Sequence, residues 1–182
     1  MKIEERKIDP KHAAIDLLLI AAGLVMLILT ALSVYRSWGN LADIKIPTGF
    51  SFWGKADLNF AGYGNRKPLV TNLVAGAMFY LALLIFAKYP QIWNVGFQIP
   101  PKAQKPVTIW TRHVLCGFAL ICSLDHCSFV WAAAKGKDLW APTSLLLFIA
   151  MALLLIMGVW MTVKALSAAR KEDTEEKSDE LR

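Results

Sequence analysis

Hydrophobic residues along this chain gather in four long blocks, which polar or aromatic segments separate. The blocks cover residues 13–35, 69–87, 110–131 and 144–162. Each block is long enough to cross a hydrocarbon core of about 30 Å as an α-helix that rises about 1.5 Å per residue. The pattern therefore predicts an all-α integral membrane protein with four transmembrane helices. We expect a transmembrane domain at 13–167, a polar N-terminal segment at 1–12 and a charged tail at 168–182.

The first block could instead be the apolar core of a cleaved signal peptide. Such a core usually has about 7–15 residues and precedes a small-residue cleavage site. Residues 13–35 form a longer block, and its end reads Ser33-Val34-Tyr35-Arg36, so an uncleaved helix is favoured. Amphipathic rings, which favour the headgroup level, mark the ends of the blocks. They are Tyr35, Trp38, Tyr89, Trp93, Trp110, Trp131 and Trp140.

Composition agrees with the pattern, because 56% of the 182 residues are hydrophobic and the net charge is +6. Lys and Arg residues favour the cytoplasmic side of a membrane helix. Most of the 20 Lys and Arg residues lie on the side of the N-terminus, which predicts that both ends are cytoplasmic. The basic residues flank apolar blocks and form no stripe with interleaved aromatics, so the expected partner is the lipid bilayer and not nucleic acid.

The longest connector, residues 36–68, is expected outside the membrane as a structured extracytoplasmic loop. Ile44-Lys45-Ile46-Pro47-Thr48 alternates apolar and polar residues, as a short strand does. Glycines in the loop permit positive φ angles, and Asp57 can accept backbone N–H bonds in a turn. The loop is either a cap over the helix ends or a recognition surface for an extracytoplasmic peptide or lipid.

Three segments of this loop resemble the signature of a bacterial membrane-domain family of unknown function, which reads I-P-x-H-F, G-x-x-D and Y-G-x-K. They are Ile46-Pro47-Thr48-Gly49-Phe50, Gly54-Lys55-Ala56-Asp57 and Gly62-Tyr63-Gly64-Asn65-Arg66-Lys67. After the next block, residues 88–94 resemble the family's Y-P-x-x-x-N turn. Gly49 stands where the family has histidine.

This domain forms the N-terminal part of SdpI-type proteins, which protect a bacterium from its own toxic peptide. The resemblance implies a multi-pass protein of the bacterial inner membrane that is not an enzyme. It implies that the protein senses, or gives immunity to, an extracytoplasmic peptide. The recognition residues that it suggests are Pro47, Phe50, Gly54, Asp57, Tyr63 and Lys67.

Asp125 and His126 are the ionisable residues that the sequence places deepest in a span. A charge in lipid costs several kcal/mol unless it is paired, so such residues are functional candidates. They could relay a proton in a small transporter or transporter accessory subunit, which would need a homo-oligomer or a partner membrane protein. Alternatively, they hydrogen-bond a neighbouring helix, with Ser123, Ser128 or Asn72 as partners.

Metal and cofactor chemistry is not expected. The third block offers only pairs of ligands, such as Cys122 with His126, whereas a zinc site needs three or four that converge. Four-helix thiol oxidoreductases need paired cysteines at the membrane surface, but Cys116, Cys122 and Cys127 all lie inside one apolar block. Motifs for a nucleophilic serine, a phosphate loop and a zinc protease are also missing from the sequence.

Overall fold

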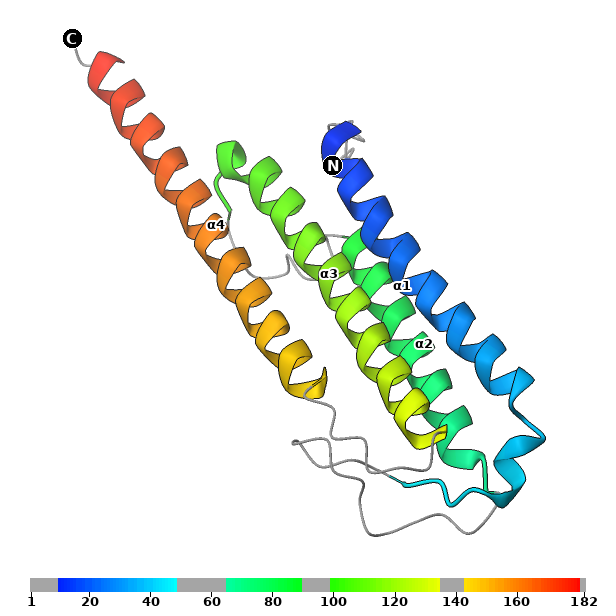
Figure 1. Ribbon diagram of the computed structural model, residues 1–182. Coiled ribbons are helices and arrows are strands. Elements are labelled where there is room, and N and C mark those ends of the chain that lie inside the picture. The colour runs from blue at the N-terminus through cyan, green and yellow to red at the C-terminus, as the bar shows by residue number, and fades with distance from the viewer. Residues whose placement is uncertain (1–9, 49–64, 90–98, 135–142, 181–182) are drawn as a thin grey trace.

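The computed structural model describes residues 10–48, 65–89, 99–134 and 143–180, and these ranges contain four long α-helices (Figure 1). The helices are α1 (Pro10–Arg36), α2 (Lys67–Lys88), α3 (Pro101–Ala134) and α4 (Thr143–Glu180), and a short 3-10 helix, η1, covers Asn40–Asp43. Each α-helix is long and apolar enough to cross a membrane. The structure therefore confirms the prediction of four helices whose length and composition suit a membrane span.

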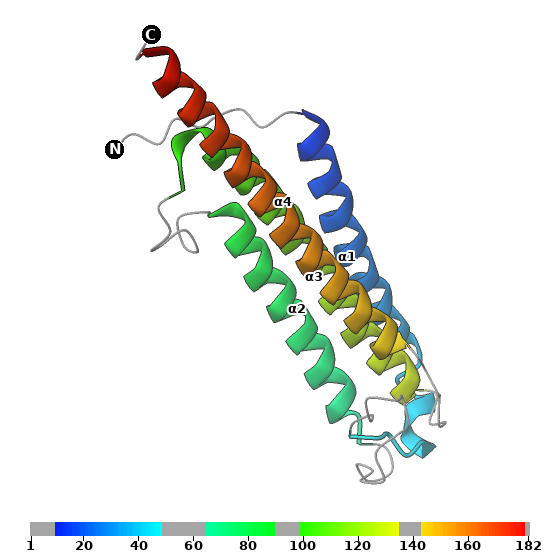
Figure 2. The ribbon, with the colours of Figure 1, turned by 90° about the vertical axis from the view of Figure 1, so that its left-hand side faces the viewer.

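The helices alternate in direction, with α1 and α3 running one way and α2 and α4 the other (Figures 1 and 2). The start of α1 therefore lies at the same end of the bundle as the end of α4. We call this the terminal end. The opposite end, where α1 ends, η1 lies and α2 begins, is called the loop end.

Helix α3 is the centre of the bundle (Figure 2). It packs against each of the other three helices, whereas the more extensive contacts of α4 are all with α3. In the most apolar stretch of α3, 39% is buried inside the structure, whereas in the corresponding stretch of α4 only 6% is buried. The outer face of α4 displays large apolar side chains such as Leu146, Leu153, Ile156, Val159 and Val163. Exposed apolar surface on this scale is typical of a face that lipid or another membrane helix covers.

Small residues let the helices approach closely, as is common where membrane helices pack. A Cβ atom at Gly76 of α2 would lie 2.7 Å from the Cβ atom of His126 on α3. A Cβ atom at Gly158 of α4 would lie 2.7 Å from a methyl group of Val114. Gly76 and Gly158 therefore mark close contacts between helices.

Two helices reach well beyond the apolar blocks. Hydropathy identifies only the part of a helix that lipid surrounds, so it did not predict their full length. Helix α3 starts at Pro101 instead of residue 110, and α4 continues to Glu180 instead of ending at residue 162. Ala103 and Val107 of α3 pack there against Ala169 of α4. The 34 residues of α3 span about 50 Å, more than the hydrocarbon core of about 30 Å.

Candidate functional site

The first part of the loop after α1 is docked onto the loop end of the bundle. Ile46 and Pro47 are fully buried, and Ile46 packs in one cluster with residues of three helices. The buried members of this cluster are Val34, Leu41, Ile46, Leu69, Val130 and Ala133. The chain is extended where it leaves η1 at Ile44 (φ −100°, ψ 134°). This part of the loop is therefore a cap on the helix ends.

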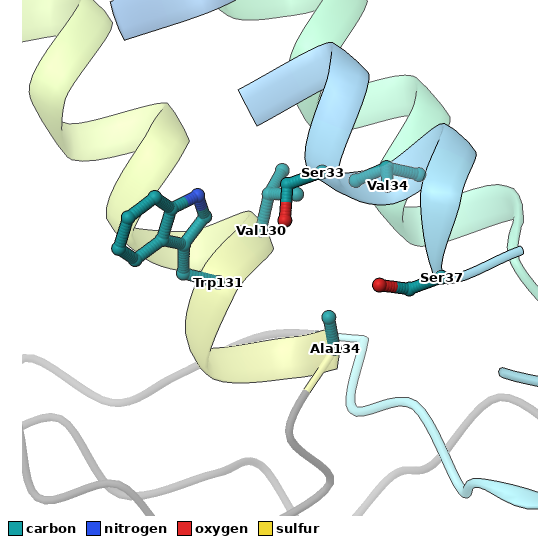
Figure 3. A pocket seen from close by; sticks show the side chains of 6 residues that line it. All are labelled: Ser33, Val34, Ser37, Val130, Trp131 and Ala134. Atoms are coloured by element: carbon teal, nitrogen blue, oxygen red, sulfur yellow. The ribbon is translucent and has the colours of Figure 1, made fainter. Parts of the chain in front are cut away.

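A pocket of about 300 Å³ opens beside this cap, between α1 and α3 (Figure 3). Ser33 and Val34 of α1 and Ser37, which directly follows that helix, line one side, and Val130, Trp131 and Ala134 of α3 line the other. Val34 and Val130 also belong to the cluster that buries Ile46. The pocket thus combines an apolar floor, two hydroxyl groups and a Trp131 ring that is 49% exposed.

A basic side chain lies over an aromatic ring at the same end. The guanidinium carbon of Arg66 is 4.8 Å from the centre of the Trp38 ring, which is a cation–π contact. The Nε atom of Arg66 is buried without a hydrogen-bond partner in the described part of the chain. Lys67 is exposed in the first turn of α2, and its backbone N–H donates to the Asn65 side-chain oxygen at 3.1 Å.

Of the six predicted recognition residues, the structure describes only two. Pro47 is buried in the cap, and Lys67 is exposed at the start of α2. The other four, Phe50, Gly54, Asp57 and Tyr63, lie outside the described residues. The structure therefore places Pro47 as a packing residue and Lys67 as an accessible one.

The structure does not bring the side chains of Asp125 and His126 together. Consecutive residues of a helix point about 100° apart. His126 Nδ1 donates to the Cys122 carbonyl at 2.9 Å, and its ring lies 5.9 Å from that of Phe79 on α2. The carbonyl of Asp125 accepts from the Ser128 hydroxyl at 2.8 Å.

The side chains expected to serve as partners of Asp125 or His126 are bonded elsewhere. Ser123 donates to the Ala119 carbonyl, and Asn72 donates to the Pro68 carbonyl. Each of these bonds, like that of Ser128, stays within one helix. Among the described residues, interhelical hydrogen bonding by Asp125 and His126 through these partners is not observed.

A charged cluster that the sequence analysis missed lies at the terminal end, between α1 and α3. Asp16 is only 1% exposed, and both of its oxygens are bonded. Oδ2 accepts from Arg112 Nε at 2.6 Å, and Oδ1 lies 2.5 Å from His113 Nδ1. The other nitrogen of His113, Nε2, lies 2.9 Å from His12 Nδ1. We call His12, Asp16, Arg112 and His113 the Asp16 cluster.

Asp16 lies beyond the part of α1 where the helix dipole stabilises a carboxylate. Because α1 begins at Pro10, Asp16 lies almost two turns inside the helix, and the helix dipole acts mainly within the first turn. The Arg112 guanidinium balances its charge instead, and His113 is hydrogen-bonded to it. Alternate helices of a bundle run in the same direction, so the starts of the first and third apolar blocks meet at one depth. That relation, applied to His12, Asp16, Arg112 and His113, is the signal that could have revealed the cluster.

The Asp16 cluster is not arranged as a metal site. No group of three or more His, Cys, Asp or Glu side chains in the described ranges could hold a metal ion. The carboxylate oxygens are bonded to Arg112 and His113, and the two imidazoles face each other across a hydrogen bond. All three cysteines are free thiols.

The chain was compared with protein-family models, with curated proteins and with solved structures. No family model, no curated protein and no solved structure matches it. The residues and geometry of the chain itself therefore carry the functional argument.

Proposed function

We propose that the chain is a non-enzymatic, multi-pass protein of the bacterial inner membrane, related to the SdpI-type domain family. In this proposal both termini are cytoplasmic and the loop end faces outward. The protein senses, or gives immunity to, an extracytoplasmic peptide. The loop residues that resemble the family signature support this function.

The observation that carries the proposal is the pocket at the loop end. Val34 and Val130 form part of its wall and also bury Ile46, so the start of the signature segment and the pocket form one packed unit. A volume of about 300 Å³ is at the small end of the range for ligand sites and suits one or two side chains of a peptide. Peptides that lie in the membrane interface present apolar side chains at this depth.

Filling the pocket tests this proposal. Ser33 is exposed on the pocket rim, so Ser33→Phe should place a ring in the pocket without disturbing the buried cluster. Survival of cells that express the protein is measured during challenge with a panel of membrane-active peptides. We expect the wild-type chain to increase survival for at least one peptide and Ser33→Phe to reduce that protection about tenfold, the effect of losing about 1.4 kcal/mol of binding.

Thr71→Phe is the matched control, because Thr71 is also exposed near the loop end but does not line the pocket. Cells that carry this variant should survive as well as cells with the wild-type chain. Equal protection by Ser33→Phe and wild type would refute the role of the pocket. Survival with the wild-type chain that never exceeds that of the empty vector would refute the immunity function.

A small transporter, or an accessory subunit of one, is the second candidate function. The contact between Asp16 and His113 favours it, because the two residues form an Asp–His pair within the apolar helices. Asp125 and His126, the pair first considered for this role, point in different directions. Vesicle uptake driven by a pH gradient, and its loss in Asp16→Asn, would separate this function from peptide sensing.

A further inference from the structure

The Asp16 cluster forms a continuous path from a partly exposed imidazole to a buried carboxylate. His12, in the first turn of α1, is half-buried, whereas His113 is 6% exposed and Asp16 is 1% exposed. The contacts along the path are 2.9 Å between the imidazoles and 2.5 Å from His113 to Asp16. Both contacts are close enough for a hydrogen bond.

Arg112 keeps the carboxylate end of this path electrically balanced. Its guanidinium is always protonated in proteins and lies 2.6 Å from Asp16 Oδ2. The pair carries no net charge, which offsets part of the cost of burying the carboxylate. His113 then donates its Nδ1 proton to Asp16 Oδ1, which leaves Nε2 as the nitrogen that meets His12.

The contact between the two imidazoles accommodates a single hydrogen. Two ring nitrogens 2.9 Å apart form a hydrogen bond only when one carries a proton and the other a lone pair. If both histidines were cationic, two N–H groups would oppose each other. The pair can therefore accept one additional proton and keep its hydrogen bond, but it cannot accept two.

From this geometry we propose that His12, His113 and Asp16 form a proton-binding relay at the terminal end of the bundle. A proton binds His12 Nε2, and the Nδ1 proton of His12 passes to His113 Nε2. His113 is now an imidazolium whose Nδ1–H bonds to Asp16 Oδ1. The added positive charge then rests on His113, next to the Asp16 carboxylate. The site binds one proton, and this function is separate from peptide recognition at the loop end.

Few other ionisable groups surround the relay. Helix α3 adds Cys116, whose buried thiol lies beside Asp16, and α1 adds Lys11 next to His12. Helix α2 contributes Tyr80, whose hydroxyl donates to the Ile20 carbonyl at 2.7 Å. Helix α4 has no charged residue between Leu145 and Val163, and the ammonium of Lys164 lies over the Trp160 ring.

A purely structural contact between α1 and α3 would need fewer residues than the Asp16 cluster contains. The bond from Asp16 to Arg112 alone ties α1 to α3 and balances the buried charge. His12 adds nothing to that balance, yet its ring is hydrogen-bonded to His113 and lies edge-on to Trp110, with ring centres 6.4 Å apart. A relay explains why a second imidazole is held between the buried pair and the end of the bundle.

Nuclear magnetic resonance of the histidine rings tests the relay directly, since the chain has only three histidines. The full chain, labelled with ¹⁵N-histidine, is placed in lipid nanodiscs and titrated between about pH 5 and 8, where histidine usually changes charge. Ring ¹⁵N shifts distinguish N–H from unprotonated nitrogen. His126, which bonds to the Cys122 carbonyl, is the internal reference.

We expect the resonances of His12 and His113 to change together, as coupled groups do. In His12→Gln the titration midpoint of His113 should move by about one pH unit, and in Asp16→Asn the resonances of both rings should change. Asp43→Asn, which alters an exposed carboxylate at the loop end, should change neither. His126 should respond to none of these substitutions.

Independent titration of His12 and His113 would overturn the proposal. So would a His113 titration in His12→Gln that equals that of the wild-type chain. His12 is half-buried and is not needed to balance Asp16, so His12→Gln should still fold even if Asp16→Asn does not. That variant alone therefore decides the question.

Discussion

Replacement of Arg112 by glutamine is expected to lower the free energy of unfolding by about 3 kcal/mol, because it leaves Asp16 as a buried charge without its cation. Both oxygens of Asp16 are bonded, and its side chain is 2% exposed. Glutamine can still donate hydrogen bonds but supplies no positive charge. Equilibrium unfolding of the purified chain in mixed detergent micelles, followed by circular dichroism, measures the change.

The two partners should not be equivalent in this experiment. The Arg112 side chain is 29% exposed, so in Asp16→Ala its charged group can turn toward water at the terminal end. Asp16 has no such route in Arg112→Gln. Asp16→Ala should therefore destabilise the chain less than Arg112→Gln does, and the double variant should lose less than the sum of the two single losses.

Arg170→Gln is the matched control, because Arg170 is exposed on α4 and makes no ion pair in the described residues. Exposed charges of this kind usually contribute less than 1 kcal/mol. An Arg112→Gln variant as stable as Arg170→Gln would contradict the role of Arg112 in balancing the buried carboxylate.

Gly76→Ala is expected to lower the free energy of unfolding by about 2 kcal/mol, since an added methyl group has no space between α2 and α3. The new Cβ atom would lie 2.7 Å from the Cβ and 3.0 Å from the Cγ of His126. A Cβ atom is fixed to the backbone, so rotation of the imidazole cannot relieve the contact. The helices would have to move apart along their interface.

Two other glycines provide controls for the same unfolding measurement. Nothing lies within 4 Å of a Cβ atom added at Gly39. At Gly117 the nearest atom is the terminal Cδ2 of Leu154, which a change of rotamer can move. Replacement of either glycine by alanine should hardly change the free energy of unfolding. If Gly76→Ala and Gly117→Ala lowered the free energy of unfolding equally, the contact between α2 and α3 would be no tighter than the contact between α3 and α4.

The four spans could be predicted from the sequence because lipid imposes a strong and local constraint. Every backbone polar group in the hydrocarbon must be satisfied within the helix, so an apolar block of sufficient length identifies a span without knowledge of its neighbours. The ends were harder to predict. Residues 101–109 of α3 are mixed in polarity, and their helical packing against Ala169 depends on a partner far away in the sequence.

The candidate sites depend even more on tertiary contacts. Asp16, taken alone, looks like an interfacial residue, and Arg112 looks like a charge that orients a helix. Only the pairing of α1 with α3 brings their side chains within 2.6 Å. Conversely, Asp125 and His126 are adjacent in the sequence, yet the helix turns their side chains in different directions. Depth in a span identified polar residues, but it did not identify which of them would meet.

The central claim is that the chain crosses the membrane four times and that the terminal end and the loop end lie on opposite sides. Single cysteines at Lys11, Thr48 and Lys171, in a chain whose three native cysteines are replaced, test it with a membrane-impermeant maleimide. We predict that Thr48→Cys is labelled on intact cells, and that Lys11→Cys and Lys171→Cys react only after permeabilisation. Labelling of Lys11→Cys and Lys171→Cys on opposite sides, or of all three on one side, would contradict the account.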